Sequence, residues 1–250
     1  MNGRRRLENG EYADYSAILR QDSLWQPGTI KLADDSTWTY QEPDAKVTVR
    51  RERLRIRVIP FTRHHDIVQT LDNSKHLYFS RSTYPESIED ETEYAVSMSA
   101  RGVQTNEGEI YDGFVAFHLL DAESGIAADF FASNDSIAIA YSRPKVTDPK
   151  IRASKERKYL AVFKEVDVKT SSGELHDYRI IYNPEQDRIS WSLDGEMVSE
   201  EKNVPSRVKS FRLGLGVMTA KTITNGKSIS NHGQGIIGQW SPVRITQAKT

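Results

Sequence analysis

The stretch Arg53-Leu54-Arg55-Ile56-Arg57-Val58 alternates strictly between arginine and a branched apolar residue. Successive side chains of a β-strand point to opposite faces of a sheet, so the apolar residues would lie on one face and the arginines on the other. This pattern is typical of a strand that has one face buried and the other in water. It predicts a sheet that covers an apolar core on one side.

The same alternation recurs along the chain, at 93–101, 178–182, 189–193 and 211–217. Between 111 and 143 the runs are more continuously apolar, which predicts central strands covered on both faces and arranged as a meander. Turn residues separate the runs, and Asp194-Gly195 predicts a hairpin. Only 11–20 and 66–75 are compatible with short helices. The sequence therefore predicts an all-β fold, an antiparallel two-sheet jelly-roll sandwich with few or no helices.

The chain has 250 residues and no linker or change of composition along it. This length is sufficient for a large apolar core. We therefore expect a single jelly-roll domain over 1–250, with 1–24 as an N-terminal extension that packs on the domain or leads into it.

Composition limits the possible chemistry. The chain has no cysteine, which excludes disulfides, thiolate zinc sites, iron–sulfur clusters and cysteine nucleophiles. Its 34 basic and 35 acidic residues leave a net charge of −1, which gives no overall attraction to nucleic acid. The first thirty residues contain no long apolar run. We expect a cytoplasmic protein, a monomer or homodimer, that binds neither nucleic acid nor membrane.

Several landmarks follow one another in a recognisable order. They are an N-terminal segment with Trp25 and Trp38, the run VTVRRERLRIRVIPF at 47–61, and the run HDYRIIYNPEQDRISWSLDGEMV at 176–198. In this order the chain resembles the concanavalin A-like lectin/glucanase jelly rolls, and more closely a poorly characterised set of bacterial and fungal proteins with that fold. The resemblance implies two curved antiparallel sheets and a concave face that is the ligand cleft in relatives.

Hydrolases of that group carry Glu-x-Asp-x-Glu on one strand, which puts three carboxylates on the cleft face. The nearest segment of this chain, EDETE at 89–93, has no Asp at its middle position, and only Glu93 would reach far into a strand. A solvated acidic loop is the alternative interpretation. The departure argues against a glycoside hydrolase of the usual type.

Two polar residues interrupt the apolar meander. His118 follows Phe114 and Ala116 on one strand face, and Asp129 lies within the run IAADFF at 126–131. Burying a carboxylate costs several kcal/mol unless it is paired, so Asp129 needs a partner such as Arg101, Arg143 or His118. A structural ion pair and a catalytic acid–base pair both remain open.

A second polar cluster spans 63–76 and holds three of the six histidines. In a helix, Gln69, Asp72 and His76 would share a face, so that the aspartate could orient the histidine. In an extended segment His65 and Gln69 would share a side instead, and a polar loop without function is the third possibility. The spacing does not favour a metal site. The candidates are His76 and Asp72 as catalytic residues, and His64, His65, Gln69 and Lys75 as ligand-binding residues.

The remaining candidate ligand-binding residues lie on other predicted strands and in one loop. Gly214 and Gly216 share a face, which leaves room either for a ligand or for close packing of another segment. A nearby loop contributes His232. Trp191 and Tyr141 are large enough to stack on a planar ligand or a sugar, although interior strand positions also suit core residues.

Two functions from different classes remain. The first is an enzyme without metal or other cofactor that acts on a small organic ligand by cyclisation, isomerisation or elimination, possible steps in a biosynthetic pathway. His118 or His76 would be the base and Asp129 or Asp72 its acidic partner. The second, implied by the resemblance alone, is a carbohydrate-binding or glycan-processing protein.

Overall fold

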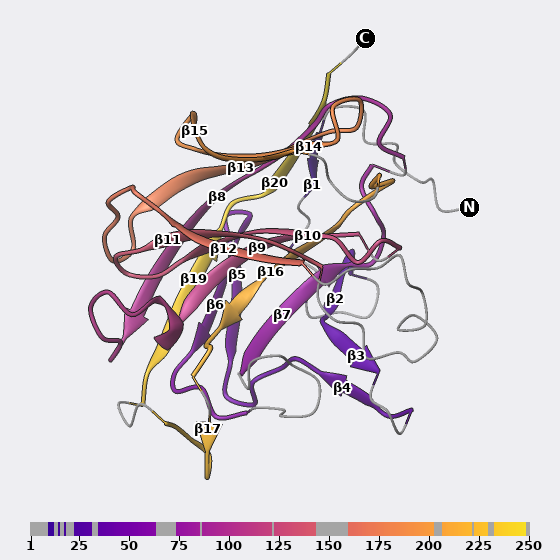
Figure 1. Cartoon of the computed structure of the whole chain (residues 1–250). Helices are drawn as coiled ribbons and strands as arrows, with labels where there is room; N and C mark the ends of the chain where they lie inside the picture. Colours follow the sequence, from indigo (N-terminus) through magenta and orange to yellow (C-terminus); the bar gives the residue numbers. More distant parts are fainter. Residues whose placement is uncertain are drawn as a thin grey trace.

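The protein is described by a computed structural model, which consists of strands in two large sheets (Figure 1). The residues that it describes are 10–12, 15, 18, 23–31, 35–63, 74–85, 87–121, 123–143, 160–202, 207–221, 223–229 and 233–248.

The strands of the described residues, together with a 3-10 helix, are β1 (Gly10–Tyr12), β2 (Trp25–Pro27), β3 (Thr29–Lys31), β4 (Thr37–Thr39), β5 (Lys46–Arg50), β6 (Arg53–Val58), β7 (Lys75–Ser80), β8 (Thr92–Val103), η2 (Ile110–Asp112), β9 (Phe114–Leu120), β10 (Ala127–Ala132), β11 (Ile137–Arg143), β12 (Leu160–Val166), β13 (Leu175–Asn183), β14 (Arg188–Leu193), β15 (Glu196–Lys202), β16 (Arg212–Met218), β17 (Ile223–Thr224), β18 (Lys227–Ser228), β19 (Gly235–Trp240) and β20 (Val243–Gln247).

Two antiparallel sheets account for most of these strands. The nine-stranded sheet has the order β15-β14-β13-β8-β19-β6-β5, with β20 pairing with β8 and β1 pairing with β20. The seven-stranded sheet has the order β12-β11-β10-β9-β16-β7-β2. Within it, β9 to β12 form the expected meander, and β16 and β7 come from distant parts of the chain. The predicted all-β sandwich is confirmed.

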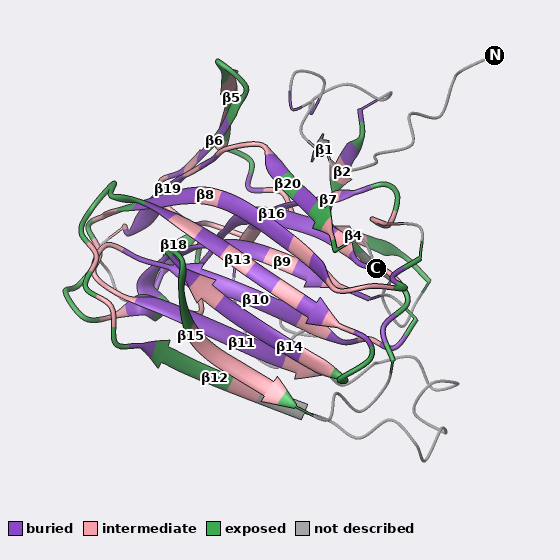
Figure 2. Ribbon diagram, turned by 90° about the horizontal axis from the view of Figure 1, so that it is seen from above, coloured by how far each residue is buried: buried purple, intermediate pink, exposed green. Residues whose placement is uncertain are grey.

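The core lies between the two sheets and follows from the period-2 alternation. Leu54, Ile56 and Val58 are buried while Arg53 and Arg55 are exposed, as the opening pattern predicts. Figure 2 shows the same alternation of buried and less buried positions on β13. One contiguous apolar cluster joins the inner faces of both sheets, and its largest fully buried side chains include Trp25, Trp191 and Trp240.

The predicted hairpin at Asp194-Gly195 connects β14 to β15. Asp194 and Gly195 both have positive φ, 52° and 92°, as a two-residue turn between twisted strands requires. The Asp194 carboxylate bonds His176 Nδ1 at 2.6 Å and the Asp177 N–H at 2.8 Å. This turn is therefore tied to the neighbouring strand β13.

The structure describes only parts of the two short helices considered in the sequence. Within 11–20, Tyr15 and Ile18 form a single 3-10-type turn, in which the Ile18 N–H donates to the Tyr15 carbonyl oxygen at 2.9 Å. Residues Gly10–Tyr12 form a strand rather than the start of a helix at 11–20. Lys75 opens β7, and most of the segment 66–75 lies outside the described residues. No helix in the described part of the chain has the length and apolarity needed to cross a bilayer.

Replacing Trp191 tests the core. Trp191 is fully buried, and its Nε1–H donates to the Asp129 carbonyl oxygen at 3.1 Å. Because Trp191→Phe removes this hydrogen bond and leaves a void, we expect the free energy of unfolding to fall by about 1–3 kcal/mol. Urea denaturation measures the change. Met197→Ala, at a residue that is 63% exposed on β15, is the control and should stay within about 0.5 kcal/mol of the parent.

The Asp194 turn predicts a pH dependence of stability. Burial alone would raise the pKa of Asp194, but the hydrogen bonds from His176 and from the Asp177 N–H outweigh it and the pKa is lowered. A carboxyl whose pKa is lower in the folded than in the unfolded state stabilises the fold above its unfolded pKa, and this contribution is lost as pH falls through the folded pKa. The urea midpoint of the parent should therefore fall more steeply than that of Asp194→Asn below about pH 4. Equal slopes would contradict this prediction.

Candidate functional site

The outer face of the seven-stranded sheet, which we call the floor, carries a second apolar cluster separate from the core. Alternate residues of each strand point to it, so that its side chains come from β7, β9, β10, β11 and β16. The buried apolar members of this cluster are Leu77, Ile110, Phe114, Ala116, Phe131, Ala138, Ala140 and Met218.

His118 and Asp129 are the polar pair at the middle of the floor. They are direct cross-strand partners on β9 and β10, and His118 Nδ1 lies 2.7 Å from Asp129 Oδ1. Both side chains are nearly buried, with 12% and 8% of their surface exposed. Since a carboxylate only accepts hydrogen bonds, Nδ1 carries the hydrogen and Nε2 of the neutral ring is the free base. His118 Nε2 has no hydrogen-bond partner among the described residues.

Aromatic rings hold the His118 imidazole on two sides. Phe79 stacks on it at a centroid distance of 6.1 Å and an interplanar angle of 27°. Phe131 meets it edge-on at 5.7 Å. Phe131 in turn contacts Phe114 and Phe163. The base is therefore fixed in orientation by Asp129 and in position by apolar contacts, an arrangement suited to proton transfer.

The two floor glycines allow close packing and do not open space for a ligand. A Cβ on Gly214 would lie 2.5 Å from Phe79 Cε1 and 2.9 Å from His118 Cβ. A Cβ on Gly216 would meet Leu77 Cδ2 and the carbonyl oxygen of His76. The prediction that Gly214 and Gly216 bind a ligand is wrong, since side chains of β7 fill the space above them.

Lys75 also lies on the floor, at the start of β7. It is half-buried, and its Nζ lies 5.3 Å from the centre of the Tyr40 ring. Burial lowers the pKa of Lys75 to about 8, and the negative charge of Asp129 opposes this shift. The structure thus places Lys75 on the same face as His118 and Asp129.

His76 does not join this group. It follows Lys75 on β7 and points to the opposite face, where its Nδ1 accepts the Glu42 N–H at 3.0 Å. Burial lowers the pKa of His76 to about 4, so it is neutral near pH 7. The sheet therefore separates His76 from His118 and Asp129, and its proposed pairing with Asp72 stays a prediction because Asp72 lies outside the described residues.

Trp191 and Tyr141 lie in the core, on the side of the seven-stranded sheet away from the floor. Their rings contact each other at 6.2 Å, and their predicted role as walls of a ligand site is wrong. The other candidates, His64, His65, Gln69, Asp72 and His232, lie outside the described residues.

Sequence reasoning missed Phe79, Phe131 and Tyr40. The alternation in KHLYFS at 75–80 would have placed Lys75 and Phe79 on one face if that segment had been read as a strand from its first residue. Glu93, from the hydrolase-like segment, lies away from the floor on the nine-stranded sheet, where it faces Arg179 at 3.5 Å. Its placement gives the hydrolase interpretation no support.

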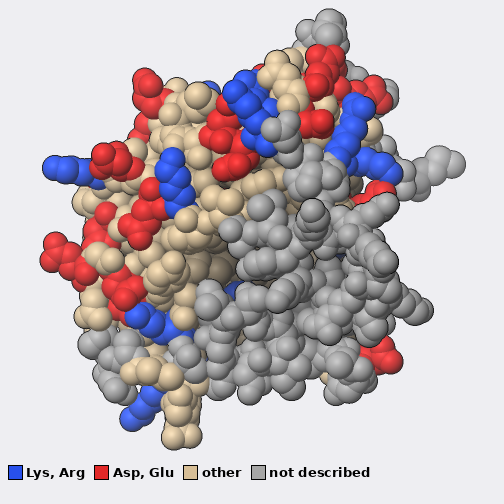
Figure 3. Space-filling model, in the orientation of Figure 1, with Lys and Arg blue, Asp and Glu red and all other residues tan. Residues whose placement is uncertain are grey.

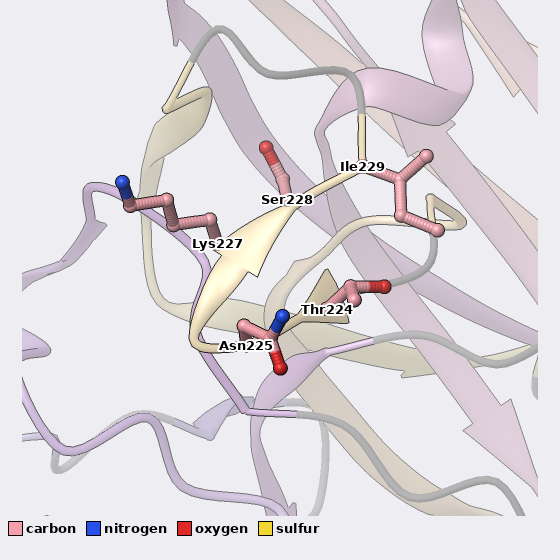
Figure 4. Close-up of a pocket in the computed structure, with 5 residues that line it drawn as sticks. All are labelled: Thr224, Asn225, Lys227, Ser228 and Ile229. Carbon is pink, nitrogen blue, oxygen red and sulfur yellow. The ribbon is translucent and has the colours of Figure 1, made fainter.

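The rest of the described surface has no comparable cluster of polar and aromatic side chains. A hollow at the β17–β18 hairpin is lined by Thr224, Asn225, Lys227, Ser228 and Ile229, whose side chains diverge in Figure 4. The face in Figure 3 has a hollow near its centre with uncharged surface along its described side. Among the described residues, no three His, Cys, Asp or Glu side chains gather as metal ligands would. The floor is the best candidate.

A family model described as "Family of unknown function (DUF6081)" matches residues 12–249. The chain belongs to this family. No curated protein matches it in sequence.

Solved structures with similar folds include many proteins that act on or bind glycans. A LamA variant from Zobellia galactanivorans in complex with laminaritriose and laminaritetraose has a TM-score of 0.57 and 17% identity, covering 89% of this chain and 92% of that one. An endo-β-1,4-glucuronan lyase from Trichoderma reesei has a TM-score of 0.55 and 13% identity, covering 90% and 95%. A sialidase has a TM-score of 0.52 and 10% identity, covering 97% of this chain and 19% of its own length. At these identities the likeness shows the fold, and it confirms the expected concanavalin A-like jelly roll.

Replacing Gly214 tests the packing of the floor. The new Cβ in Gly214→Ala would collide with Phe79, so we expect a loss of about 1–3 kcal/mol in the free energy of unfolding. In the Phe79→Ala background the same substitution should cost at least about 0.5 kcal/mol less, because the colliding ring is gone. Denaturation of the four proteins in this cycle gives the coupling energy. Additive losses would contradict the assignment of Phe79 as the group that fills the glycine gap.

Proposed function

We propose that the floor binds a saccharide and that His118, oriented by Asp129, acts on it as a general base. The observation that carries this proposal is the 2.7 Å contact between His118 Nδ1 and Asp129 Oδ1. It leaves Nε2 buried among aromatic rings and without a hydrogen-bond partner among the described residues. A base held in this way is suited to removing a proton from carbon or oxygen.

The chemistry of the floor favours proton abstraction over hydrolysis. Retaining and inverting glycosidases need two carboxyl groups across the scissile bond. At the centre of the floor Asp129 is engaged with His118, and the acids Glu91 and Glu93 form ion pairs on the other sheet. An elimination or isomerisation step therefore suits these residues better.

Two observations support a saccharide as the ligand. The structural relatives include a protein in complex with laminaritriose and a glucuronan lyase. The floor also has an exposed aromatic ring at its edge, Phe163, which is 41% exposed and can stack on the apolar face of a sugar. We retain in this proposal the expectations of a cytoplasmic location and of activity without a metal or other cofactor.

A small apolar organic molecule is the second candidate ligand. The floor between Leu77, Phe114 and Met218 is aliphatic and aromatic, with few polar groups to bond sugar hydroxyls. The same base would then serve a cyclisation, isomerisation or elimination on a carbon skeleton.

The experiment that tests these proposals is a ligand screen followed by mutation. A ligand that binds only the folded state raises the melting temperature, so oligosaccharides should raise it more than apolar compounds do. If only apolar compounds raise it, the second candidate replaces the first.

Once a ligand is turned over, His118→Asn and Asp129→Asn should each lower kcat by about 10²–10⁴-fold. Met197→Ala, on the opposite sheet, should keep the parent kcat and controls for general damage. Unchanged kcat in both floor variants would exclude the pair from the reaction.

A further inference from the structure

Lys75 is half-buried and differs in its surroundings from the described lysines that form ion pairs. Lys202, Lys209 and Lys221 have carboxylate partners at 2.9 Å. Lys75 forms no ion pair among the described residues, and its cross-strand partner on β16 is Met218. Its Nζ lies over the ring of Tyr40. A half-buried lysine that forms no direct ion pair is poorly stabilised as an ammonium ion.

Lys75 belongs to the same surface as the candidate base. It precedes Leu77 and Phe79 at two-residue intervals on β7, and Phe79 stacks on His118. The Asp129 carboxylate is close enough to act on the charge of Lys75. A ligand that lies along β7 could therefore contact both Lys75 and His118.

We infer that Lys75 is a nucleophilic amine that forms an imine with an aldehyde or ketone group of a ligand bound on the floor. The neutral Nζ attacks the carbonyl carbon, and the electrons of the C=O double bond move to oxygen. The resulting carbinolamine loses that oxygen with both amine hydrogens as water, and a C=N bond forms to Nζ. No oxidant, reductant or metal is needed for this condensation.

The groups around Lys75 are compatible with this chemistry. Burial lowers its pKa to about 8, so that near neutral pH a fraction on the order of a tenth is the reactive free amine. Burial raises the pKa of Tyr40 to about 12, so the phenol stays protonated there. Among the described residues, the other titratable groups on this face include His118, Asp129 and Tyr111, whose ring contacts Phe163, with Arg212 and Glu165 at more distant positions. Glu42 bonds Thr62 and the Arg63 N–H, and with His76 it lies away from Lys75.

The inference deepens the proposed function, because it names a carbonyl as the group that the floor would recognise. A reducing saccharide in its open-chain form and a small organic aldehyde share this group. An imine at Lys75 does not require turnover by His118, so the two ideas can fail separately.

Reductive trapping on the full-length protein tests the inference. The folded chain is incubated near pH 7.5 with sodium cyanoborohydride and either benzaldehyde or laminaritriose, and modified lysines are located by peptide mass spectrometry. We expect Lys75 to be labelled at least about tenfold faster than Lys227, an exposed lysine of the β17–β18 hairpin, with one of the two probes. The probe that succeeds identifies the source of the carbonyl.

Variants separate the possible outcomes. Lys75→Arg keeps the charge and should abolish the fast labelling, whereas Lys227→Arg should leave it unchanged. Met197→Ala, on the opposite sheet, should also leave it unchanged and controls for general damage to the fold. Labelling of Lys75 no faster than Lys227 with both probes, in a protein shown by circular dichroism to be folded, would overturn the inference.

Discussion

Both faces of the seven-stranded sheet are apolar, and this constraint shapes everything else in the molecule. One face must pack against the nine-stranded sheet, which it does through the core that contains Trp25, Trp191 and Trp240. The other face forms a second apolar cluster of its own. Burial of apolar surface on two sides stabilises the central strands, and it leaves polar groups there only where they are paired.

His118 and Asp129 are paired polar groups of this kind. Each would be costly alone on the floor, and together they satisfy one hydrogen bond while leaving His118 Nε2 without a partner among the described residues. The opposite face supports the pair, because Trp191 bonds the backbone carbonyl of Asp129 from the core. The core and the candidate site are therefore coupled through one strand, β10.

The close contacts of the floor depend on residue size as much as on polarity. Gly214 lets Phe79 cross over β16 and stack on His118. Lys75, on the same strand as Phe79, is held in surroundings that disfavour its charge. A base, an amine of lowered pKa and several aromatic rings thus share one face of the sheet. This is a more specific chemical description than the fold provides, because jelly rolls serve many functions.

The sequence by itself determined the strands, their alternation and the all-β class, because a period of two is a local property that each segment carries alone. It also indicated that Asp129 needed a partner, since the cost of a buried carboxylate is independent of the fold. Only the tertiary structure decided that this partner is His118, that Trp191 and His76 face away from the floor, and that Phe79 occupies the glycine gap. Alternation divides a strand into two faces, but the packing of distant strands decides which face becomes the core and which residues of β7, β9, β10 and β16 become neighbours.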